Sequence, residues 1–93
     1  MFWAFRFVAV AQLNVQQVAT AAAITTATSN VLVGALCGDA LTVGNANVAI
    51  GDSALTTDTQ GDRNVAIGYL ALENQNFTSS TDSYNTAVGY NAG

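Results

Sequence analysis

The sequence predicts an all-β fold of stacked repeats, either a β-solenoid, a β-roll or an interleaved triple β-helix. The first observation is a nine-residue pattern that occurs three times: residues 47–55, 64–72 and 85–93 read NVAIGDSAL, NVAIGYLAL and NTAVGYNAG. The second is its spacing. A divergent copy, NVLVG, begins at residue 30, and subtraction puts the four starts, Asn30, Asn47, Asn64 and Asn85, 17, 17 and 21 residues apart. Self-similarity of this kind indicates one structural unit per repeat.

The repeats divide the chain into two parts. Residues 30–93 are expected to form the repeat region, and residues 1–29 an apolar segment for docking or assembly. A doubtful fifth copy starts at Asn14, followed by Val15. Helix is the competing interpretation of residues 8–24, because apolar side chains there can be placed at helical spacing; the threonines between residues 20 and 28 favour strand.

Each repeat is interpreted as one turn of the stack. Side chains alternate along a strand, so Val48 and Ile50 are expected to point into the core, while Asn47 and Ala49 point away from it. Ala54 and Leu55 are expected to form a second short strand, and residues 56–63 to return the chain to the next turn. The predicted core residues are Val31, Val33, Val48, Ile50, Val65, Ile67 and Val88.

Two further columns follow from stacking equivalent residues. Glycine recurs at one position, where a positive φ or a close backbone approach is expected; these turn residues are Gly34, Gly51, Gly68 and Gly89. The starting asparagines align in the same way, and their amides are expected to hydrogen-bond along the stack as a ladder of Asn30, Asn47, Asn64 and Asn85.

Length and composition indicate that the fold depends on partners. A chain of 93 residues buries little surface, and with one cysteine, Cys37, and no histidine it has neither an internal disulfide nor an ordinary zinc site. Stability is therefore expected to come from other subunits. Cys37 itself is expected to be a small core residue rather than a reactive thiol.

Several functional classes are disfavoured. A net charge of −4 with two arginines argues against nucleic acid, because phosphate binding needs cations. No catalytic or cofactor motif occurs, so we expect neither an enzyme nor a cofactor. Polar residues interrupt the uncharged stretch of residues 7–38, so membrane insertion is not expected, and Arg6 interrupts a weak signal-peptide pattern.

The acidic residues allow one alternative site. Asp52 with Asp39, or Asp58 with Asp62, could be calcium ligands, although aspartates at glycine-rich corners more simply cap their own turns. Arg63 is expected to pair with Asp62 or with an acid of a neighbouring chain.

Aromatic residues are the candidate partner contacts. Tyr69 and Tyr90 occupy equivalent repeat positions and should stack, either as a structural ladder or, with Tyr84, as a recognition surface. The inserted loop of residues 73–83 is a second recognition candidate because loops vary around a fixed scaffold. At the N-terminus, four aromatics in seven residues are expected to contact another subunit or protein. The predicted contacts are Phe2, Trp3, Phe5, Phe7, Tyr69, Tyr90 and Phe77.

The motif NVAIG, followed by a small or aromatic residue and then Ala-Leu, resembles the repeats of bacteriophage tail-fibre and other virion appendage proteins. It is also similar to the head repeats of trimeric autotransporter adhesins. The resemblance covers residues 30–93. It implies β-rolls or interleaved triple β-helices in which three chains pack around one axis and present binding surfaces to a host cell.

The expected function is that of a structural protein of a phage virion appendage, located in the virion tail or capsid appendage. It would form a homotrimeric β-rod, contact other virion proteins and present contacts to a host-surface receptor. Two alternatives remain, a bacterial trimeric surface adhesin module and a self-assembling extracellular filament subunit. Because Gly93 falls where earlier copies have leucine, the chain is also expected to be a piece of a longer one.

Overall fold

The computed structural model describes residues 14–17, as backbone, and residues 25–93. This part of the chain is all-β, with seven short strands and no helix. It also contains no helix long and apolar enough to cross a membrane. The strands are β1 (Asn14–Gln17), β2 (Asn30–Val33), β3 (Val48–Ile50), β4 (Gly61–Asp62), β5 (Val65–Ile67), β6 (Thr81–Asp82) and β7 (Thr86–Val88).

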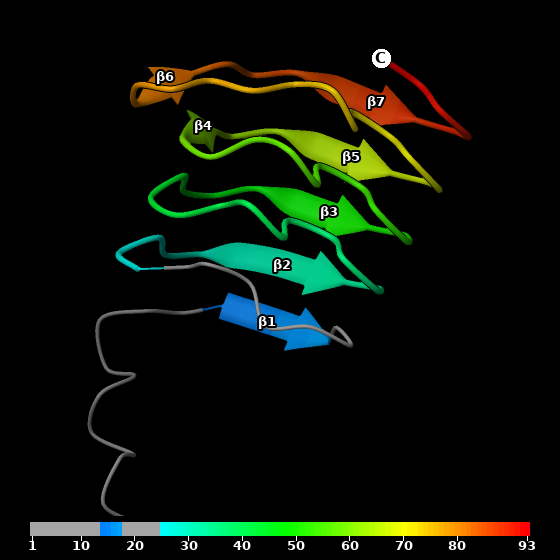
Figure 1. Cartoon of the computed structure of the whole chain (residues 1–93), viewed down its shortest axis with the longest axis horizontal. Coiled ribbons are helices and arrows are strands. Elements are labelled where there is room, and N and C mark those ends of the chain that lie inside the picture. Colours follow the sequence, from blue (N-terminus) through cyan, green and yellow to red (C-terminus); the bar gives the residue numbers. More distant parts are fainter. Residues whose placement is uncertain (1–13, 18–24) are drawn as a thin grey trace, which may run out of the picture.

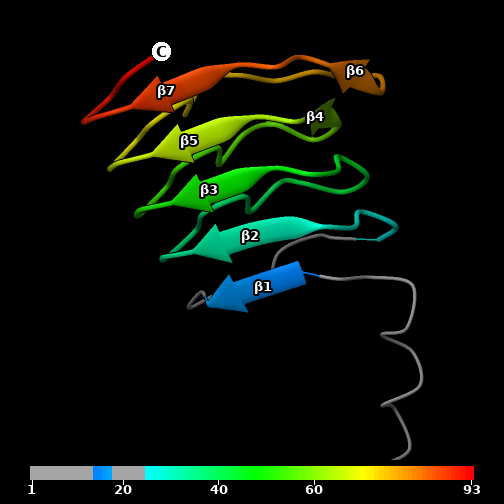
Figure 2. The same cartoon turned by 180° about the vertical axis from the view of Figure 1, so that it is seen from behind.

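Five strands form one parallel sheet in the order β1-β2-β3-β5-β7 (Figure 1). After each strand the chain turns back and returns to the same side, so that successive strands lie one above another; Figure 2 shows the return segments from behind. We call one strand with the segment that leads to the next strand a coil. The register aligns equivalent repeat positions, as in Val48 with Val65 and Ile50 with Ile67.

The sheet begins earlier than the predicted boundary at residue 30. Asn14 pairs in register with Asn30, so the doubtful fifth copy is part of the stack. Within residues 8–24, for which helix was the competing interpretation, the described residues are the strand β1. The other residues of that range lie outside the described part of the chain.

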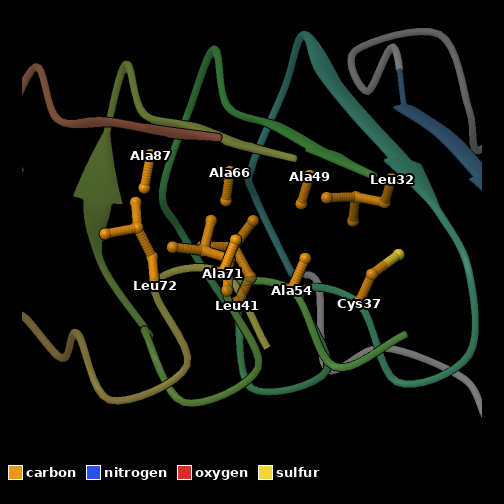
Figure 3. Close-up of a cluster of buried hydrophobic side chains, with 10 residues drawn as sticks. Leu32, Cys37, Leu41, Ala49, Ala54, Ala66, Ala71, Leu72 and Ala87 are labelled. Atoms are coloured by element: carbon orange, nitrogen blue, oxygen red, sulfur yellow. The ribbon is translucent and has the colours of Figure 1, made fainter. Parts of the chain in front are cut away.

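The predicted core has the wrong face. Val31, Ile50 and Val88 are 36%, 38% and 66% exposed, and Val33, Val48, Val65 and Ile67 are half-buried. The side chains that point into the coil are instead the alternate ones, Leu32, Ala49, Ala66 and Ala87, which lie in a row opposite the return segments (Figure 3). Their partners across the coil are Cys37, Leu41, Ala54, Leu55, Ala71 and Leu72.

The physical reason is the asparagine at the start of each repeat. Asn47 and Ala49 lie on one face of β3, and Asn47 is fully buried because its amide bonds to groups inside the stack. Alternation then turns Ala49 inward and Val48 and Ile50 outward. Alanine also fits the narrow space between the strand and its return segment.

The second strand of each repeat was also wrongly placed. Ala54 and Leu55 lie in a turn, where the Leu55 backbone has φ 54°. The additional pairing occurs later in the coil, between Gly61 and Thr81 and between Asp62 and Asp82. The latter partners are 20 residues apart, three more than the basic repeat, so three of the four additional residues fall at 78–80.

Candidate functional site

The outer face of the parallel sheet is the main candidate site. It consists of two columns of side chains, one beginning at Val31 and the other at Val33, and we call it the apolar face. The first column contains Val31, Val48, Val65 and Thr86, and the second contains Val33, Ile50, Ile67 and Val88. Seven of these eight side chains are aliphatic and none is charged.

A glycine corner ends each strand and fixes the apolar face. Gly34, Gly51, Gly68 and Gly89 all have φ of 129–130°. A Cβ at Gly51 would lie 2.7 Å from the carbonyl carbon and oxygen of Gly68, and at Gly68 2.6 Å from the Gly89 oxygen. The sequence predicted a positive φ or a close backbone approach here, and Gly51 and Gly68 have both.

The buried asparagines hold the coils together on the opposite side of the strands. The backbone N–H of Asn47 donates to Oδ1 of Asn30 at 2.8 Å, that of Asn64 to Oδ1 of Asn47 at 2.9 Å, and that of Asn85 to Oδ1 of Asn64 at 3.2 Å. The Nδ2 group of Asn47 also donates to the Gly61 carbonyl at 2.9 Å. This arrangement is the predicted ladder, but it runs through the interior of the coils.

Tyr69 and Tyr90 form an exposed stack just beyond the glycine corner. Their ring centroids are 5.7 Å apart with an interplanar angle of 23°, and they are 49% and 75% exposed. One coil below, Asp52 is exposed, and its carbonyl accepts a hydrogen bond from the Leu70 N–H. The corner therefore presents two aromatic rings with a carboxylate at the equivalent position beneath them.

The loop of residues 73–83 is attached to the coil below. The Phe77 carbonyl accepts bonds from the Gln60 N–H and the Thr59 hydroxyl, and its half-buried side chain lies near Gly61. Sequence analysis grouped Phe77 with the exposed tyrosines as a contact residue. The structure does not bring them together, because Phe77 belongs to the return segment.

The acidic residues proposed as calcium ligands are occupied by internal bonds. Asp58 is fully buried and accepts bonds from the N–H groups of Gly61 and Phe77 and from Nε2 of Gln75. Asp62 accepts from the Asn45 N–H and from the Ser80 hydroxyl. Within residues 25–93, no three side chains of the types that hold metals come together.

Arg63 pairs with Asp82 rather than with Asp62. Its guanidinium also lies 5.8 Å from the centroid of the Tyr84 ring, whose hydroxyl donates to Asp82 at 3.3 Å. All three side chains are exposed, so the ion pair contributes little to stability.

Cys37 lies inside the coil stack. It is fully buried, and burial raises the pKa of its thiol from 9.0 to about 11. Its place agrees with the expected role of a small core residue. The predicted contacts Phe2, Trp3, Phe5 and Phe7 lie outside the described residues.

Comparisons with known proteins found no matching protein family, no matching curated protein and no matching solved structure.

Proposed function

We propose that this chain is a structural subunit of a virion appendage, such as a tail fibre, and that three copies form a β-solenoid rod around a common axis. The observation that carries the proposal is the apolar face. It follows the stack through β2, β3, β5 and β7 and leaves large aliphatic side chains such as Ile50 and Val88 exposed in the single chain.

An apolar outer face on a parallel sheet needs a cover. Parallel sheets are almost always covered on both faces, and here the return segments cover only the inner one. Burying a valine or isoleucine side chain stabilises an assembly by about 1.5–3 kcal/mol. Seven such side chains on each chain, with no charge among them, would make association strongly favourable.

Symmetry supports a cover made of the same chain. The columns of the apolar face run along the stack, so a rotation axis parallel to the stack brings identical coils together at the same height. A cyclic arrangement of this kind closes and buries every copy of the face. The number three and the virion location are supported by the resemblance of the NVAIG repeats to phage appendage proteins.

The mass of the purified chain in solution tests the proposal. Light scattering should give three times the 9.5 kDa chain mass. Ile50→Lys places a charge in the centre of the apolar face and should yield a smaller species with an unchanged β-type circular dichroism spectrum. Thr57→Lys, at an exposed position on the return segment, is the matched control and should remain trimeric. A folded monomer from the unchanged chain would overturn the proposal.

A bacterial surface adhesin module is the second candidate, and the exposed Tyr69–Tyr90 stack favours it. Rigid tyrosines with free hydroxyls are common in recognition surfaces. Replacing both with alanine should abolish binding to whole cells if the stack is a receptor contact, whereas Tyr84→Ala at a separate exposed position should not. Equal binding by all three proteins would remove the support for this candidate.

A further inference from the structure

The upper edge of β7 is the least satisfied part of the described backbone. In the coil below, the Val65 N–H donates to the Asn85 carbonyl at 2.8 Å, and Oδ1 of Asn64 accepts from the Asn85 N–H. The equivalent groups one coil higher are the Thr86 N–H and Oδ1 of Asn85. Neither has a partner among the residues that the structure describes.

This edge has the form of a template for one more repeat. Three successive coil junctions use the same donor and acceptor, because the N–H after the asparagine donates upward at 2.8 Å from Val31, Val48 and Val65 alike. An added strand must therefore be parallel, and it must begin with a residue that offers a backbone carbonyl to Thr86 and a backbone N–H to Asn85.

The chain contains a strand that meets these conditions at the other end of the sheet. β1 begins at Asn14, in register with Asn30, and is paired on one side only within the described residues. It is a parallel strand that begins with the same residue type as the repeats. Unpaired strand edges readily pair with another chain.

We propose that the upper edge of β7 pairs with the free edge of β1 in a second copy, parallel and in the register of the other coils, so that rods extend head to tail. The Thr86 N–H then donates to the carbonyl of the second copy's Asn14, and the N–H of that residue donates to Oδ1 of Asn85. The contact is heterologous and does not close, so it generates filaments. It is independent of the apolar face.

Sedimentation of the purified 93-residue chain over a range of concentrations is the first test. It should show species at integer multiples of the basic assembly, and electron microscopy should show rods that lengthen with concentration. Thr86→Pro removes the donor at an edge position that tolerates proline, and Asn85→Ala removes the acceptor. Each should raise the concentration needed for stacking by about tenfold. Asn74→Ala, which changes an exposed asparagine without a hydrogen bond in residues 25–93, should not.

A disulfide test identifies the pairing partners. Neighbouring parallel strands are about 4.8 Å apart, within the Cα separation of a disulfide. Chains carrying Asn14→Cys, mixed with chains carrying Asn85→Cys and oxidised, should therefore link to one another. A mixture of Asn14→Cys with Asn74→Cys chains should not link.

Each outcome separates this inference from the proposed function. Trimers that never form multiples would overturn the inference and leave the trimer intact. Multiples of a single chain, linked between positions 14 and 85, would support the inference and overturn the trimer. Links between two copies of position 85 would show pairing of β7 with itself and overturn the inference.

Discussion

The two faces of each strand differ in a way that hydrophobicity alone does not explain. The inner face of β3 carries Asn47 and Ala49, and both are fully buried, whereas the outer face carries the larger and more apolar Val48 and Ile50. In a single chain the more hydrophobic side is therefore the more exposed side. Side-chain size and hydrogen bonding decide which face is inside, and the remaining apolar face is available for association.

The glycine corner gives the largest expected effect. Gly68→Ala should destabilise the chain by about 4 kcal/mol, because a side chain at φ 130° is strained and its Cβ would lie 2.6 Å from the Gly89 oxygen. Gly89→Ala is the matched control. It has the same φ, but its Cβ meets nothing closer than Ala92 at 4.0 Å, so about 2 kcal/mol is expected. Urea unfolding measures both, and equal losses would contradict the close approach.

The buried ladder should show the next largest effect. Asn47→Ala removes the donor to the Gly61 carbonyl and the acceptor for the Asn64 N–H, and it leaves both groups buried without a partner. A loss of about 3 kcal/mol in the free energy of unfolding is expected. Asn74→Ala provides the reference for an exposed asparagine and should change stability by less than about 0.5 kcal/mol. A similar value for Asn47→Ala would mean that the ladder contributes nothing net.

Neighbouring residues on β5 compare the two faces directly. Ala66→Val overpacks the inner face and should cost about 2 kcal/mol at every protein concentration. Val65→Ala affects only the half-buried outer face, so its cost should depend on protein concentration, as expected for a side chain that stabilises an assembly. Thermal unfolding at several concentrations measures this difference. If Ala66→Val were neutral, the assignment of the inner face would be wrong.

The corner before each ladder asparagine offers a stabilising change. The residue at this position has a positive φ in four successive coils, at Ser29, Ala46, Arg63 and Tyr84. Ala46 is exposed with φ 60°, so Ala46→Gly should raise stability by about 1 kcal/mol. Ala35→Gly, at an exposed position without a positive φ, should lower it slightly. Chemical denaturation of the pair shows whether the gain belongs to the corner.

Cys37 should have the smallest effect at neutral pH. Its thiol pKa is raised from 9.0 to about 11, so the unfolded chain ionises first as the pH rises. The stability associated with the protonated thiol is complete below pH 9 and is lost between pH 9 and 11. Unfolding measured across this range should show a decline that Cys37→Ala reduces. The thiol should also react with a thiol reagent at pH 8 only after unfolding.

The sequence allowed the repeats to be located but did not fix which side of the strand faces inward. The repeat starts, the glycine corners and the ladder positions depend on identity and spacing, which are visible in the chain. The choice between the two faces depended on the general preference for burying valine and isoleucine over asparagine. Asn47 reverses this preference because the bonds that satisfy it come from Asn64 and Gly61, which are distant in sequence.

The return segments were the least predictable part. Ala54 and Leu55 have the composition of a strand end, but Ser53 and Leu55 both have positive φ and place them in a turn. The pairing of β4 with β6 left no periodic signal, since each strand has two residues and Gly61-Asp62 resembles an ordinary turn. Arg63 was likewise assigned to its neighbour Asp62, because the insertion that brings Asp82 beneath its side chain is not evident before the coils are aligned.

The contrast between the two corners of a coil determines where this architecture can accept new sequence. At the glycine corner, backbone meets backbone and even a methyl group lacks room, whereas the opposite corner has already accepted residues 78–80 between the aligned positions of neighbouring coils. Insertions, tags or foreign epitopes placed beside residues 78–80 should therefore be displayed along a single edge of the rod. The glycine edge must remain unchanged from coil to coil.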